Sequence, residues 1–170
     1  QATVANIVNL WLFGPLAYYI AINYLSTGNY YYSIISFPGM LLTQNILYYK
    51  LHQITHIPNY YWIHKFHHQF NKHTFVLPIS ANAVSIPEFL LLYILPILTG
   101  IYIFKPTEYV IIMSTMIISI GNITIHSPIL ANIEYPNYIV SPKKHINHHI
   151  KNIKHNYSAP LLDIDYILDM

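Results

Sequence analysis

The sequence predicts an all-α integral membrane protein with about four membrane-spanning helices in two hairpins and a cytoplasmic helical cap. Charged residues make up 8% of its 170 residues, against about 25% in ordinary soluble proteins, so charges cannot cover a soluble surface. Long apolar segments alternate with short polar ones. Eleven histidines are present, and eight of them fall in three short clusters. The length suggests a single domain, residues 1–170.

Composition excludes several classes of function. All eight basic residues are lysine, and the net charge is only +2. The sequence therefore lacks the arginines that read phosphates and bases, and it does not indicate a nucleic-acid partner. Cysteine is absent, which rules out disulfides and thiolate ligands. The chain starts at Gln1 without a methionine, so a truncated N-terminus is an open alternative.

The first predicted hairpin contains residues 4–24 and 30–49. The first segment is nearly free of charge and is about as long as the roughly 20 residues that span a bilayer. A turn is expected at 26–29, where Ser, Thr, Gly and Asn follow one another. The second segment is interrupted by Pro38 and carries the polar pair Gln44 and Asn45, so it is the weaker of the two.

The second predicted hairpin contains residues 86–104 and 109–125. Pro87 and Glu88 stand in the first turn of the third span, where a proline and an acidic residue near the positive helix end are both favourable. A short turn begins at Lys105, and the fourth span ends at His126. Four crossings would place residues 50–85 and 126–170 on the same side, so all clustered histidines can meet there.

Lysines indicate which side this is. Seven lysines lie in the segments on the histidine side, and Lys105 alone lies on the other. Because lysine is enriched on the cytoplasmic side of membrane proteins, we expect the histidine side to face the cytoplasm.

The histidine spacing predicts a polynuclear metal site. His64, His67 and His68 have the spacing i, i+3, i+4, and residues 145–149 repeat it. On a helix these positions share a face, so we expect each cluster to aim three imidazoles in one direction. His52 and His56, at i and i+4, add two more. Neutral imidazole is the commonest protein metal ligand, and it suits zinc, copper, iron and nickel. His73 lies outside this spacing, and we do not expect it to bind metal.

With these motifs the sequence resembles the fatty acid hydroxylase/sterol desaturase superfamily of integral membrane di-iron oxygenases. The resemblance covers about residues 40–170, and a SIPEFLL segment at 85–91 is similar to sterol-oxidising members. The order of the motifs, their spacing and the hairpin between them all match. The residues that carry the resemblance are His52, His56, His64, His67, His68, Asn122, His126, His145, His148, His149, Asn156, Tyr157 and Asp165.

The resemblance implies specific roles. Asn122, Asn156 and Tyr157 would lie near the metals, with no catalytic residue apart from the ligands. The cofactors would be two iron ions, replaceable by zinc in a purified sample, together with O2 and electrons from NAD(P)H through a cytochrome b5-type donor. The substrate would be a sterol or another lipid, in lipid biosynthesis at the endoplasmic reticulum of a eukaryotic cell. The nine implied metal ligands are His52, His56, His64, His67, His68, His126, His145, His148 and His149.

The sequence also departs from the family pattern. Gln44 and Asn45 stand where an acidic residue usually precedes the first histidine, and Gln53 replaces an arginine. Ile146 replaces an aspartate, Pro128 a glycine, and Asp169-Met170 a closing Gly-Thr. Acidic residues normally orient ligating imidazoles, so these changes bear on activity more than on metal binding. The alternatives are a lipid desaturase on the same scaffold and an inactive metal-binding homologue. A transporter is disfavoured, because its ionisable ligands should lie within the spans.

Overall fold

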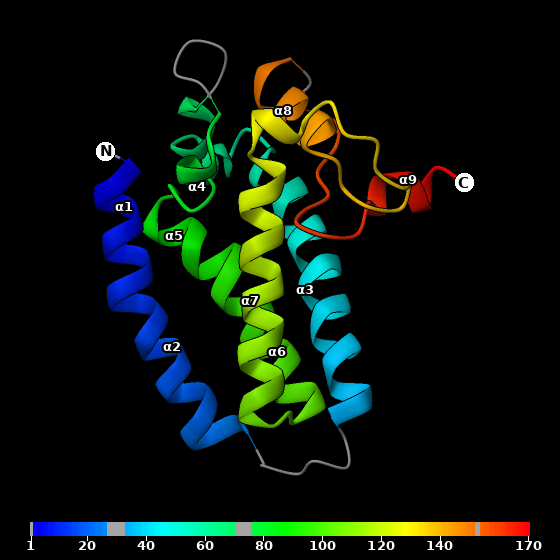
Figure 1. Ribbon diagram of the computed structural model, residues 1–170. Coiled ribbons are helices and arrows are strands. Elements are labelled where there is room, and N and C mark those ends of the chain that lie inside the picture. The colour runs from blue at the N-terminus through cyan, green and yellow to red at the C-terminus, as the bar shows by residue number, and fades with distance from the viewer. Residues whose placement is uncertain (1, 27–32, 71–75, 152–153) are drawn as a thin grey trace.

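The computed structural model describes residues 2–26, 33–70, 76–151 and 154–170, and the regular elements within them are helical (Figure 1). Three π-helical stretches, Asn9–Phe13, Ala21–Leu25 and Phe89–Ile94, continue their neighbouring α-helices. Short 3-10 turns lie at His67–Gln69, Pro78–Ser80 and Pro128–Leu130. The α-helices are α1 (Ala2–Val8), α2 (Gly14–Ile20), α3 (Ser33–Thr55), α4 (Tyr61–His64), α5 (Ile86–Glu88), α6 (Leu95–Phe104), α7 (Glu108–Ile125), α8 (Pro142–Ile150) and α9 (Ile164–Leu168).

Three helical segments are long and apolar enough to cross a membrane: Ala2–Leu25, Ile86–Phe104 and Glu108–Ile125. They correspond to the first, third and fourth predicted spans. The predicted second span lies in α3, which is 23 residues long but falls outside this set. Residues 30–32 of that prediction, and most of the predicted turn at 26–29, lie outside the described residues. Three candidate spans are therefore present among the described helices, and α3 packs beside α6 and α7 in the same bundle (Figure 1).

The polar residues that weaken the apolar pattern of α3 are bonded inside the protein. The side chain of Gln44 donates to the carbonyl of Leu92 at 3.3 Å. Asn45 accepts from the backbone N–H groups of Leu161 and Leu162 at 3.2 and 2.9 Å. Buried polar groups are costly unless they are hydrogen-bonded. These two side chains tie α3 to the candidate span Ile86–Phe104 and to the C-terminal segment.

Side-chain caps set where several helices begin. Ser85 accepts from the backbone N–H of Glu88, and Thr107 accepts from that of Val110. Ser141 caps α8 in the same way. Such caps satisfy N–H groups that a helix start leaves without partners. They fix the starts of the candidate spans Ile86–Phe104 and Glu108–Ile125 and of the helix that carries the last histidine cluster.

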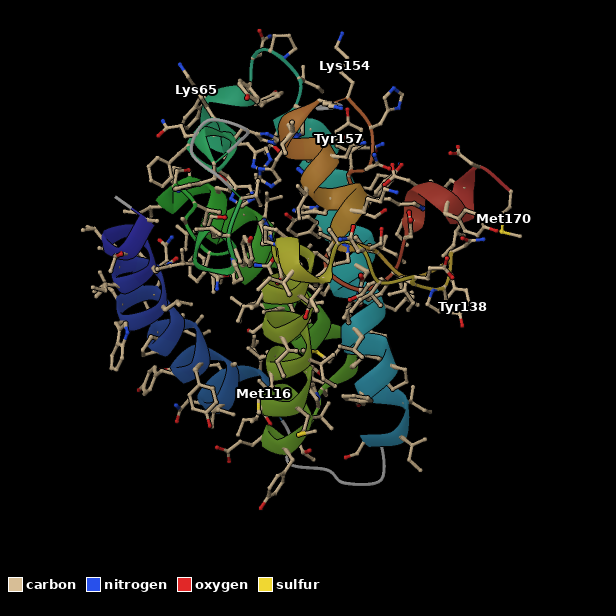
Figure 2. The ribbon with its side chains drawn as sticks, turned by 45° about the horizontal axis from the view of Figure 1, so that its top comes forward. Lys65, Met116, Tyr138, Lys154, Tyr157 and Met170 are labelled. Atoms are coloured by element: carbon tan, nitrogen blue, oxygen red, sulfur yellow. The ribbon has the colours of Figure 1, made fainter. Side chains whose placement is uncertain are left out.

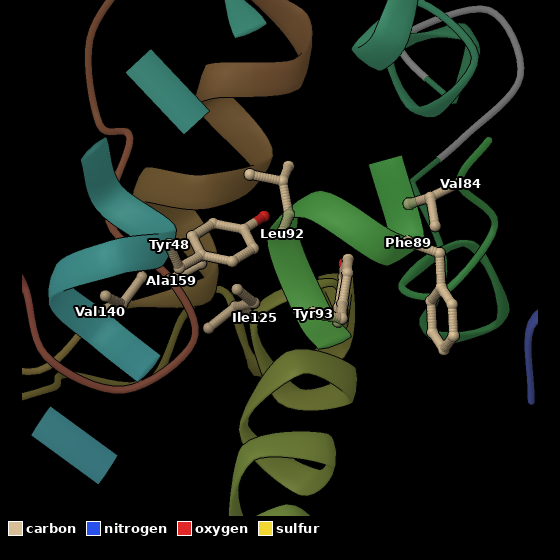
Figure 3. Close-up of a cluster of buried hydrophobic side chains, with 8 residues drawn as sticks. All are labelled: Tyr48, Val84, Phe89, Leu92, Tyr93, Ile125, Val140 and Ala159. Carbon is tan, nitrogen blue, oxygen red and sulfur yellow. The ribbon is translucent and has the colours of Figure 1, made fainter. Parts of the chain in front are cut away.

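A buried hydrophobic cluster underlies the histidine end of the bundle (Figure 3). Tyr48 of α3, Leu92 of the candidate span Ile86–Phe104 and Ile125 of α7 meet there with Val140 and Ala159 from the C-terminal segments. A side chain at Gly121 would place its Cβ 2.7 Å from Leu161 Cδ2, so glycine allows α7 to approach this segment closely. The cluster holds α3, α7 and the C-terminal segment together where all three carry histidines or their partners.

Candidate metal centre

The structure brings all nine predicted histidine ligands together at one end of the bundle, the end at which Figure 2 labels Lys65, Lys154 and Tyr157. They form two groups, and within each group the available ring nitrogens lie within 4.8 Å of one another. The five-histidine group consists of His52, His56, His64, His68 and His148. The four-histidine group consists of His67, His126, His145 and His149. The groups adjoin: the rings of His68 and His149 stack with centroids 4.7 Å apart.

Each H-x-x-H-H cluster divides its histidines between the two groups, contrary to the expectation that all three would aim one way. His64 and His68 belong to the five-histidine group, whereas His67 belongs to the other. The second cluster has the opposite arrangement. His145 and His149 lie in the four-histidine group, whereas His148 belongs to the five-histidine group. In α8, helical geometry explains the split, because residues i and i+4 differ by about 40° around the axis whereas i+3 and i+4 differ by about 100°. In the first cluster, the chain passes from α4 through a turn into the 3-10 turn His67–Gln69.

Five of the histidines have their Nδ1 atoms within hydrogen-bond distance of a fixed acceptor. His52 lies 2.8 Å from the carbonyl of Tyr157, and His126 lies 2.8 Å from that of Asn122. His148 and His149 face the carbonyls of His155 and Phe70 at 2.6 and 3.1 Å. An acceptor at Nδ1 holds the proton there and leaves the Nε2 lone pair free for a metal.

The fifth acceptor is a carboxylate that the sequence interpretation missed. Glu88, expected only to favour the positive end of its helix, is fully buried, and its Oε1 lies 2.5 Å from Nδ1 of His64. An ionisable residue within an apolar span is a functional candidate by default. That rule, applied to Glu88, would have identified it as a functional candidate, although not the histidine that it contacts.

The ring-nitrogen separations fit metal coordination. Nε2 of His52 lies 2.9 Å from that of His64 and 3.2 Å from that of His56. In the other group, Nε2 of His126 lies 3.1 Å from that of His145 and 3.3 Å from that of His67. Nitrogens bound at about 2.05 Å to one metal are about 2.9 Å apart at a right angle and about 3.4 Å apart at the tetrahedral angle. The observed distances are those of ligands around shared ions.

Electrostatics favour neutral rings with available lone pairs. Burial lowers the pKa of His56 to about 3 and that of His126 to about 4. Burial, followed by repulsion from neighbouring histidines, holds the pKa of His64 and of His145 well below the ordinary value. Nε2 of His149 is buried and has no hydrogen-bond partner within the described ranges. Metals bind the neutral form of imidazole, so both groups have the donor set and the protonation state that a metal needs.

Asn122 and Tyr157 lie next to the histidines and act through their backbone carbonyls. Asn122 accepts from His126 through its carbonyl, whereas its side chain donates to the carbonyl of Ala81 at 3.1 Å. The ring of Tyr157 packs on His56, with centroids 5.2 Å apart. Asp165 accepts two hydrogen bonds from Ser158, at 2.8 and 2.6 Å. This pair closes the loop that follows Tyr157.

Two further histidines differ from the nine. His73 lies outside the described residues, so the expectation that it binds no metal stays a prediction. The side chain of His155 is exposed, whereas its carbonyl faces Nδ1 of His148. His155 therefore contributes to the site through the backbone, a role that no side-chain motif could indicate.

Asn156 lies between His155 and Tyr157, and its backbone conformation sets the direction of their carbonyls, which face His148 and His52. Its φ of 60° lies in the left-handed region, which asparagine tolerates and β-branched residues avoid. We expect Asn156→Val to lower stability by about 1–2 kcal/mol and to weaken metal binding, because His155 and Tyr157 would turn away from His148 and His52. Asn156→Gly should preserve both properties. Thermal unfolding in detergent and metal content per chain measure the effect, and equal behaviour of the two variants would contradict it.

An apolar cavity of about 150 Å³ lies between the N-terminal helical segment and helices α6 and α7. Small residues, Gly14, Ala17 and Ala21, line it on the N-terminal segment, which stands away from α7 in Figure 1. Asn122, one helical turn before His126, lines its histidine end together with Asn82 and Tyr93. The cavity is apolar along the bundle and polar beside the four-histidine group.

Comparison with known proteins agrees with this geometry. The family model for fatty acid hydroxylases matches residues 37–169, most of the chain and every histidine of the two groups. Searches of curated proteins and of solved structures found no match. The matched segment contains two of the three candidate spans and both histidine groups. The chain belongs to the fatty acid hydroxylase family.

Proposed function

We propose that this protein is a membrane di-iron oxygenase that hydroxylates a C–H bond of a sterol or another lipid, using O2 and electrons from a membrane redox donor. The observation that carries the proposal is the pair of adjoining, buried, all-imidazole groups. Family membership supports it. When bound, iron would supply O2 activation, which needs a redox metal with open positions.

The residues of the chain have separate tasks in this proposal. The five-histidine and four-histidine groups would each hold one ion, with zinc able to replace iron in a purified sample. The carbonyls at Nδ1 orient the rings, and burial excludes water from the site. The apolar cavity would receive the apolar body of the lipid, while Asn82, Tyr93 and Asn122 would face its polar end.

The proposed membrane orientation places the histidine end in the cytoplasm. Of the described lysines, six lie in segments at the histidine end and Lys105 follows α6 at the other end (Figure 1). The predicted position of Lys72 lies outside the described residues. Lysine enrichment favours the cytoplasmic side, and we propose α3 as the fourth span. In a eukaryotic cell the endoplasmic reticulum would be the location, with NAD(P)H and a cytochrome b5-type protein as the electron source.

The reaction is tested with isotopically labelled oxygen. The chain is expressed with a reductase system, cells are supplied with 18O2, and lipid extracts are compared with those from a His148→Ala control. Hydroxylation consumes one O2, two electrons and two protons, and yields the alcohol and water. We therefore expect one 18O atom in a new lipid product, absent from the control.

The other outcomes separate the alternatives. A product that has lost two hydrogens and gained no 18O would identify a desaturase. Unchanged lipids, with two irons bound per chain and a competent donor present, would contradict the proposal and favour an inactive homologue.

A further inference from the structure

Glu88 is a buried acidic residue at the start of a candidate membrane span. It lies in the first turn of α5, and none of its surface is exposed. Oε1 lies 2.5 Å from Nδ1 of His64, and Oε2 has no hydrogen-bond partner among the described residues. Burying a carboxylate is costly unless charge and hydrogen bonds compensate it. An ionised carboxylate at this position therefore needs a source of positive charge.

A second hydrogen-bond pair fixes the two segments relative to each other. The hydroxyl of Ser85 accepts from the backbone N–H of Glu88 at 3.3 Å and donates to the carbonyl of Ile63 at 2.6 Å. Ile63 directly precedes His64. The start of α5 is thus joined to α4 at two points, because Ser85 bonds the residue before His64 and Glu88 contacts His64 itself. The carboxylate therefore has a defined position relative to the His64 ring.

We propose that Glu88 is a positioning residue of the five-histidine group, which holds the His64 ring through Nδ1 and strengthens its Nε2 as a metal ligand. This inference rests on the metal-binding part of the proposed function. The other four acceptors at Nδ1 atoms are neutral backbone carbonyls. A carboxylate at this position fixes the ring orientation and increases the basicity of the ligand more than a carbonyl does.

The histidine itself does not supply the charge that Glu88 needs. His64 is fully buried beside the rings of His52, His56, His67 and His68, and burial away from water disfavours the charged form of an imidazole. A neutral ring donates a hydrogen bond to the carboxylate but carries no positive charge. A cation bound at Nε2, on the opposite side of the same ring, would provide it. Among the described residues, Glu88 is thus an acidic partner for a candidate ligand in a sequence where Ile146 and the residues before His52 provide none.

The test measures metal affinity rather than activity. Metal-free full-length protein in detergent is titrated with Zn2+ in competition with a chromophoric chelator, and with Co2+ while the visible spectrum is recorded. The variants are Glu88→Ala, Glu88→Gln and the matched control Glu108→Ala. Glu108 also stands in the first turn of a candidate span behind a capping side chain, Thr107, but it hydrogen-bonds Tyr18 instead of a histidine.

We expect Glu88→Ala to weaken one of the two sites about 10- to 100-fold and to change the cobalt spectrum, as losses of such ligand-orienting partners do. Glu88→Gln keeps an acceptor without the charge, so it should recover part of the affinity while its spectrum stays shifted. Glu108→Ala should match the original protein. If Glu88→Ala does not fold, the Gln variant carries the test.

Two results would overturn the inference. One is equal metal affinity in Glu88→Ala and Glu108→Ala, and the other is a Glu88→Gln variant with unchanged affinity and spectrum. Failure of the unsubstituted protein to bind two metals would instead contradict the proposed function itself. The titration thus separates the two hypotheses.

Discussion

Replacing His67 or His148 with alanine is expected to reduce the metal content from two ions per chain to about one and to lower product formation about 100-fold or more. The two histidines belong to different groups, so each replacement should empty one site and leave the other occupied. The double replacement should remove both ions. Loss of partners outside the ligand set alone costs 10–100-fold, and loss of a ligand should cost at least as much.

His155→Ala is the matched control. Its side chain is exposed, and the backbone carbonyl that faces His148 is kept, so metal content should stay at two. Metal analysis of purified protein, together with thermal unfolding to confirm the fold, measures all four variants. Equal metal loss from His67, His148 and His155 replacements would show that the ligand assignment is wrong. Loss of both ions from either single ligand variant would show that the two groups do not bind independently.

Eight of the nine candidate ligands were predictable from their spacing in the sequence, whereas His126 was implied by the family resemblance. Histidines at i, i+3 and i+4 must lie near one another on any helical turn, and the hairpins return the chain to the same end. The division between two groups was not predictable from the same pattern. It depends on which group the pair His64 and His68 faces, and on which group the pair His145 and His149 faces. Tertiary packing sets these directions.

Partners that act through the backbone could not be predicted either. The carbonyls of Phe70, His155 and Tyr157 face imidazole Nδ1 atoms, and any residue type at those positions has a carbonyl. The left-handed conformation of Asn156 is a partial exception, since asparagine is enriched there. Glu88 was predictable in type, because a carboxylate in an apolar span needs a partner, but its partner 24 residues away was not.

The second predicted span shows a different limit of prediction from the sequence. Gln44 and Asn45 lower the apolar character of α3, and the segment falls outside the candidate spans. The structure shows these side chains bonded to Leu92 and to the C-terminal segment. A helix can carry polar residues on the side that packs against other parts of the protein, where a lipid-facing side cannot. A pattern along one segment does not reveal which neighbours that side has.

Filling the apolar cavity is expected to reduce product formation about 5- to 150-fold while both metals remain bound. Ala17 lines the cavity on α2, and Ala17→Phe would place a ring in a space of about 150 Å³. A lipid forced into an overfilled cavity should lose about 1–3 kcal/mol of binding free energy, which corresponds to the expected reduction in the rate of product formation. The protein itself should remain folded, because the ring enters existing space rather than a packed interface.

Leu16→Phe is the matched control, since Leu16 is the preceding residue on the same helix but is 54% exposed. The same ring there should leave product formation unchanged. Product analysis, metal content and thermal unfolding are measured for both variants in parallel.

The comparison tests where the substrate lies, because α7 lines the cavity from Ile111 to Asn122, about 16 Å along the helix. We expect an extended lipid body to lie along this length, with its polar end beside the four-histidine group. Full activity of Ala17→Phe with two metals bound would place the lipid elsewhere, and the polar end formed by Asn82, Tyr93 and Asn122 would then have no part in substrate binding.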